Sequence, residues 1–166
     1  MDKYTVSIYL EKYLAQWYIN ENGDTTPITP KKLSTESRII EVYSTKTPAN
    51  VAEEDPDESL IEVKIIIPHF RCKDPQYYNY LPREARYEFK RCVRNRFVIE
   101  LWNDLHRFGY IGKRRDKLIT AWMESHGIED DDTNFHTILK IYQRQYKNYL
   151  ERRRRERISK EKQIKA

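Results

Sequence analysis

The feature that most constrains the fold is a series of apolar residues, spaced three and four apart, that follows Pro82. Its members are Ala85, Phe89, Cys92, Val93, Phe97, Leu101, Trp102, Leu105 and Phe108. Apolar residues at this spacing form one stripe along an α-helix, and here the stripe lasts for about 25 residues. Pro82 suits the first turn of such a helix, and Gly109 and Gly112 are expected to end it. A helix of this length needs other elements to cover its apolar side, so we expect the rest of the chain to pack against it.

Two further helices are predicted after this one. The first runs from about Arg114 to His126, with Gly127 as the residue that ends it. The second begins in the segment Asp130 to Thr133, where Asp132 or Thr133 can cap it. Its apolar positions continue the same spacing: Phe135, Ile138, Leu139, Tyr142, Tyr146 and Leu150. Residues 82–150 are therefore predicted to form a three-helix unit, and the last helix is predicted to continue into a basic tail over residues 151–166.

The first 81 residues contain weaker signals for both strands and helices. Residues 4–10 alternate in polarity, as a half-buried strand does, and the spacing then becomes helical from Leu10 to Tyr18. Ser34 can cap a short helix that ends near Tyr43, and Leu60 to Ile67 is the clearest strand. The Ile65-Ile66-Ile67 run suggests burial on both faces. We therefore expect an α+β protein, mainly helical, in which a small two-strand lobe (residues 1–81) packs on the three-helix unit.

Residues 45–59 of this lobe form an acidic segment that prolines interrupt. It lacks an apolar period and contains Pro48 and Pro56. We expect a mobile loop here.

Charge is concentrated at the C-terminal end of the chain. From Lys140 onward there are eleven Lys and Arg residues against three acids, a local charge of +8. The whole chain carries +5, so residues 1–139 sum to −3. A concentrated cationic segment favours polyanions because it releases their counterions. An acidic protein partner and a merely solvated helix end are the alternatives.

The candidate nucleic-acid-binding residues lie in two clusters. One opens the second predicted helix, and the other belongs to the last helix and its tail. Together they are Lys113, Arg114, Arg115, Lys117, Arg144, Lys147, Arg152, Arg153, Arg154, Arg155 and Arg157. The three-helix unit resembles DNA-binding helical domains in outline only, because the connection Gly127–Asp132 is too long and too acidic for a helix-turn-helix.

Other aromatic and cationic residues leave two readings open. Tyr77, Tyr78 and Tyr80 lie near Arg71 and Lys73. They could stack on bases of single-stranded nucleic acid, or cover the joint between the two halves of the chain. Amphipathic tyrosines at a partly wet interface favour the joint.

No convincing catalytic or metal-binding motif is found. His69 and Cys72 have a ligand-like spacing, but Cys92 and His106 would lie about 20 Å apart along one helix, too far for one zinc ion. No nucleophile motif or phosphate-cradling loop occurs. We therefore expect no enzyme, no metal and no cofactor.

These observations favour a non-enzymatic accessory or regulatory protein that binds nucleic acid, with DNA as the favoured target. The alternative is a protein-interaction or oligomeric structural module, with a homo-oligomer or an acidic protein as partner. Two cysteines, the lack of a signal peptide and the lack of a membrane-spanning apolar run favour a cytoplasmic location. A small protein with a basic arm also suits a phage or mobile element.

Overall fold

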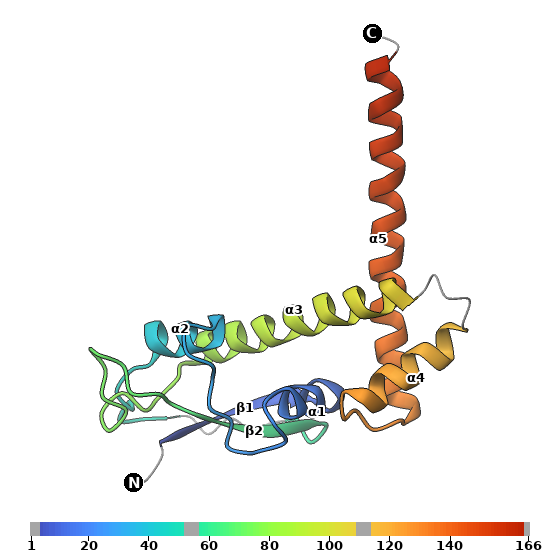
Figure 1. The fold of residues 1–166 in the computed structure, drawn as a ribbon. Coiled ribbons are helices and arrows are strands. Elements are labelled where there is room, and N and C mark those ends of the chain that lie inside the picture. Colours follow the sequence, from blue (N-terminus) through green and yellow to red (C-terminus); the bar gives the residue numbers. More distant parts are fainter. Residues whose placement is uncertain (1–3, 52–56, 109–113, 165–166) are drawn as a thin grey trace.

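The computed structural model describes residues 4–51, 57–108 and 114–164. In this part of the chain it contains five helices and a two-stranded antiparallel sheet (Figure 1). The order is β1 (Thr5–Glu11), α1 (Lys12–Glu21), α2 (Thr35–Tyr43), β2 (Leu60–Ile66), α3 (Arg83–Phe108), α4 (Arg115–Ser125) and α5 (Asp132–Ile164). The expected mainly helical α+β fold is confirmed. None of the described helices is long and apolar enough to cross a membrane.

The sheet pairs β1 with β2, from Thr5 opposite Ile66 to Glu11 opposite Leu60. The predicted burial of the isoleucine run on both faces is confirmed, since Ile65, Ile66 and Ile67 are at most 9% exposed. Between α1 and α2, Ile28 pairs with β2 in parallel. Its N–H donates to the Lys64 carbonyl at 2.8 Å, and its carbonyl accepts from the Ile66 N–H at 2.8 Å. This contact covers an edge of a sheet whose two strands alone would be marginally stable.

The short elements of the N-terminal part follow the sequence signals closely. β1 passes directly into α1, and the Ser34 hydroxyl caps α2 by accepting from the Ser37 N–H at 3.1 Å. α2 is attached to α3 by an ion pair between Glu36, which is buried, and Arg96.

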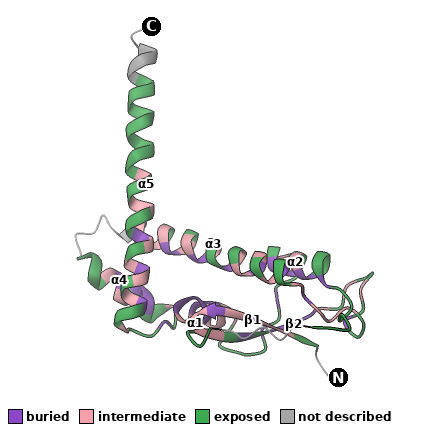
Figure 2. Ribbon diagram, turned by 180° about the vertical axis from the view of Figure 1, so that it is seen from behind, coloured by how far each residue is buried: buried purple, intermediate pink, exposed green. Residues whose placement is uncertain are grey.

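Helix α3 is the spine against which both halves of the chain pack (Figures 1 and 2). The Phe97 ring lies at the centre, with edge contacts to Tyr13, Trp17 and Trp122 at centroid distances of 5.1, 5.4 and 5.5 Å. The same hydrophobic cluster contains residues of the sheet, of α1 and α2, and of α4 and α5. The expectation that the rest of the chain covers the apolar stripe of this helix is therefore confirmed. The division at residues 81 and 150 stays a prediction.

The corner between α4 and α5 corrects one detail of the sequence analysis. Gly127 ends α4 with a φ of +66°, as expected. The cap of α5, however, is Asp131 rather than Asp132 or Thr133. Its Oδ1 accepts from the Asn134 N–H at 2.8 Å, and Asp132 is already the first helical residue. Asp131 takes the capping position because Lys12 of α1 also binds its carboxylate, at 2.8 Å, and holds it at the start of the helix.

Several sequence predictions fall on residues outside the described part. They are the helix end at Gly109 and Gly112, the binding role of Lys113, and the mobile loop at its acidic centre, residues 52–56.

Candidate nucleic-acid interface

Helix α5 changes character along its length. Its first part is held in the core by Ile138 and Tyr142, which are 0% and 6% exposed. From Leu150 to Lys160 every residue is exposed, and this stretch extends away from the rest of the molecule (Figures 1 and 2). We call residues 150–160 the projecting segment. The prediction that the last helix continues into the basic tail is confirmed.

The projecting segment carries six cations and two carboxylates, Glu151 and Glu156. Because successive residues of an α-helix are 100° apart, the four arginines 152–155 point to all sides of the helix. Among the described side chains, Arg152 has a carboxylate neighbour in Glu156, at 3.9 Å, and both are more than 60% exposed. Such an exposed pair neutralises little of the charge. The segment is therefore a cationic rod.

The start of α4 lies beside the base of this rod. Arg114, Arg115 and Lys117 are all exposed there. The Arg115 guanidinium lies over the Tyr146 ring of α5, 5.0 Å from its centroid. The two basic clusters, which the sequence placed on separate helices, thus meet at one place.

Between α3, α4 and α5 runs a groove of about 750 Å³. Four of the predicted arginines line it: Arg115, Arg153, Arg154 and Arg157. The aromatic and aliphatic part of its lining consists of Tyr142, Tyr146, Tyr149, Leu118, Leu150 and Ile158. We call this the tyrosine–arginine groove. Arg114, Lys117, Arg144, Lys147, Arg152 and Arg155 are exposed outside it.

Tyr149 organises the groove and was missed as a site residue, because the predicted site contained only lysines and arginines. Its hydroxyl accepts from Arg153 at 3.0 Å, and its ring lies 5.7 Å from the same guanidinium. The Tyr149 ring also contacts the rings of Trp102 and His106 of α3, at centroid distances of 5.6 and 4.8 Å. The signal available in the sequence was a tyrosine four residues before an arginine, which places the two side chains together on a helix.

The other tyrosine cluster, Tyr77, Tyr78 and Tyr80, lies just before α3. Tyr80 pairs through its backbone with Thr45, and its ring lies 5.9 Å from the Arg86 guanidinium of α3. Lys73 donates to two carbonyls at the end of α2 and lies over the Tyr78 ring. Tyr77 is 58% exposed. These contacts favour the joint reading over base stacking.

The cysteine and histidine pattern in the sequence forms no site. His69 and Cys72 are exposed, and Cys92 is half-buried on α3, where burial raises the pKa of its thiol. Ligand-type atoms do converge elsewhere. Glu21, Glu100 and His126 lie within 4.8 Å of one another, on three different elements.

Comparisons with known proteins give no relative: no protein-family model, curated protein or solved structure matches the chain.

Proposed function

We propose that this protein binds nucleic acid, duplex DNA in particular, and acts as an accessory or regulatory factor without catalysis. The observation that carries the proposal is the projecting segment of α5, an exposed helix with arginines on every side. Every residue of the segment is exposed, so no core stabilises this part of the helix. Its arginines also lie three and four residues apart, where like charges repel. A polyanion would remove this repulsion.

Dimensions favour the DNA major groove as the place for this helix. An α-helix with its side chains is about 10–12 Å wide, and the B-DNA major groove is about 12 Å wide. Arginines on opposite sides of the helix would then reach the phosphates of both strands. The major groove of A-form RNA is too narrow and deep for this arrangement, so duplex RNA is the poorer target.

The tyrosine–arginine groove supports the same proposal at the base of the helix. Arg115 and Arg153 are each held against a tyrosine ring, which reduces the conformational freedom that binding would remove. Guanidinium groups fixed in this way suit bidentate contacts to phosphate.

The acidic corner does not oppose this mode of binding. Arg152 follows Asp132 by twenty residues, which is about 30 Å along a helix. Screening at physiological salt limits charge effects to about 8–10 Å. Glu129 and Asp131 are also paired with Lys12, at 2.7 and 2.8 Å.

A second candidate function is protein association through the same helix. Leu150 and Ile158 are 48% and 44% exposed on the projecting segment, and both line the groove. Apolar side chains there could pack against a second copy or an acidic partner. The expectations of a cytoplasmic location and of an origin in a phage or mobile element stay predictions.

One binding experiment separates the two candidates. Fluorescence anisotropy with labelled duplex DNA, single-stranded DNA and duplex RNA is measured at two salt concentrations. The proposal predicts that duplex DNA binds most tightly and that its affinity falls steeply with salt. Light scattering at the same protein concentrations reports the oligomeric state. No binding to any nucleic acid, together with a stable oligomer, would favour the association module.

A further inference from the structure

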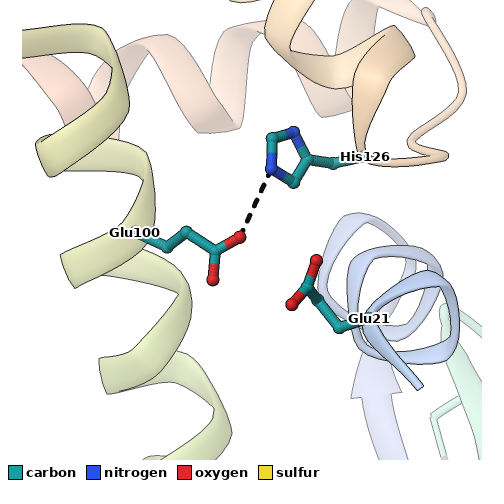
Figure 3. Close-up of side chains that lie close together, drawn as sticks. All are labelled: Glu21, Glu100 and His126. Atoms are coloured by element: carbon teal, nitrogen blue, oxygen red, sulfur yellow. Dashed lines mark ion pairs between the residues drawn. The ribbon is translucent and has the colours of Figure 1, made fainter. Parts of the chain in front are cut away.

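Three side chains with metal-ligating groups converge between α1, α3 and α4 (Figure 3). Glu21 is the last residue of α1, Glu100 lies in α3, and His126 directly follows α4. Their ligand atoms lie within 4.8 Å of one another, and all three residues are half-buried. No sequence spacing links residues 21, 100 and 126, so only the fold brings them together.

The surroundings of His126 fix which ring nitrogen faces the carboxylates. Nδ1 lies 2.8 Å from the Trp122 carbonyl oxygen, which can only accept, so Nδ1 carries the proton. The ring is also stacked on the Trp122 indole, at a centroid distance of 4.1 Å. Nε2 therefore faces Glu100. A histidine whose second nitrogen donates to a backbone carbonyl is the usual arrangement of a metal ligand.

The distance between the two facing atoms suits a metal ion bound between them. Nε2 of His126 lies 3.3 Å from Oε1 of Glu100. A charge-assisted hydrogen bond would be shorter, at about 2.7–2.9 Å. Ligands that bind a tetrahedral zinc ion at about 2.0–2.1 Å are themselves about 3.3 Å apart.

Two carboxylates, those of Glu21 and Glu100, lie beside the one imidazole of this cluster. The indole of Trp17 is 0% exposed, and its Nε1 is a buried donor that makes no hydrogen bond of normal geometry. Its interaction with Glu100 suits an outer partner of a ligating group.

We propose that Glu21, Glu100 and His126 form a zinc site with a fourth position open to water. One nitrogen and two oxygen ligands suit Zn²⁺, and the imidazole disfavours Mg²⁺ and Ca²⁺, which prefer oxygen ligands. Asp104 is a supporting residue: its carboxylate accepts from the Trp122 indole at 3.0 Å and lies 3.8 Å from Nε2 of His126. The ion would tie α1 and α3 to the corner that leads into α5. This proposal is independent of nucleic-acid binding.

The test uses the full-length protein after treatment with a chelator. Isothermal titration with Zn²⁺ is expected to show one site per chain, and one equivalent of Zn²⁺ is expected to raise the melting temperature. The same concentration of Mg²⁺ should leave the melting temperature unchanged. No stabilisation by Zn²⁺, or equal stabilisation by Mg²⁺, would overturn the proposal.

Variants assign the site to these residues. Glu21→Gln removes the repulsion with Glu100, so the metal-free variant should melt no lower than the parent, yet its Zn²⁺ affinity should fall at least about tenfold. His126→Gln should lose Zn²⁺ binding as well. His136→Gln, which changes an exposed histidine on α5, and the double variant His69→Gln, Cys72→Ser are the controls and should bind as the parent does. Parental affinity in Glu21→Gln and His126→Gln, or loss of binding in a control, would contradict the assignment.

Discussion

Gly127 is the residue whose replacement the structure constrains most clearly. Its φ of +66° lies in the left-handed region, and a Cβ there would come within 2.8 Å of Nδ2 and 3.1 Å of Cβ of Asn20. Gly127→Ala is therefore expected to lower the free energy of unfolding by more than the 1–2 kcal/mol or so that left-handed backbone costs a non-glycine residue. Urea denaturation measures this loss.

The matched control is Gly23→Ala, because Gly23 also has a positive φ, +85°, but an added Cβ meets nothing within 4 Å. It should show the backbone cost alone. Equal losses in the two variants would show that the Asn20 contact is unimportant.

The Lys12 and Asp131 pair makes stability depend on pH in a predictable direction. The hydrogen bond from Lys12, followed by that from the Asn134 N–H, lowers the pKa of Asp131. A carboxyl with a lowered folded-state pKa stabilises the fold above its ordinary pKa of about 3.9, and this contribution is lost as the pH falls through the folded-state value. The difference in stability between the parent and Lys12→Met should therefore shrink as the pH falls from 6 to 3.

Urea midpoints across this pH range provide the measurement. Lys31→Met, which removes an exposed cation in the loop before α2, is the control and should follow the parent at every pH. A constant difference between the parent and Lys12→Met would show that Asp131 is not the partner that matters.

At the scale of elements, the two tryptophans after Pro82 differ in burial, although both lie at apolar positions of their predicted helices. Trp122 is 5% exposed and contacts Phe97, whereas Trp102 is half-buried at the edge of the same cluster. Sequence spacing predicts full burial for both, with a cost of about 3–5 kcal/mol for either change to alanine. The structure keeps this expectation for Trp122→Ala and lowers it for Trp102→Ala. Equal losses on chemical denaturation would mean that Trp102 carries more of the core than its exposure indicates.

The projecting segment should gain order when it binds a polyanion. Its backbone hydrogen bonds are exposed and its arginines repel one another, so amide hydrogen exchange over Arg152–Lys160 should be fast in the free protein. Duplex DNA should slow exchange there, while exchange in the buried part of α3 should change little. Slowing confined to other regions would place the binding surface elsewhere.

Local periodicity predicted most of the elements because most of them bury a single side. The stripe of α3, the alternation in β1 and the Ser34 cap all depend on neighbours in sequence. The missed features depend on residues far apart. Asp131 is selected as a cap by Lys12, and Ile28 pairs with Lys64 and Ile66. The spacing of residues in the sequence cannot predict these contacts, since they form only when the elements pack together.

At the scale of the whole molecule, one hydrophobic cluster joins the N-terminal part to the helices, and one helix leaves it. The candidate binding surface also has two parts, the projecting segment and the tyrosine–arginine groove. The positions of Arg152–Arg155 on an exposed helix followed from charge and spacing alone. The groove beside them did not, because it requires Arg115 of α4 and Tyr149 of α5 to come together around α3.

The measurement that tests the central claim most directly is the dependence of duplex DNA affinity on salt. Three proteins are compared: the parent, a variant with Arg152–Arg155 changed to Gln, and a control that loses four exposed cations of the N-terminal part, Lys31, Lys32, Arg38 and Lys46. Both variants change the net charge equally. Loss of about four phosphate contacts should reduce the slope of log affinity against log salt by roughly 3–4 units in the arginine variant. The control should keep the parental slope; a parental slope in the arginine variant, or an equal reduction in both, would contradict the claim that the projecting segment is the contact surface.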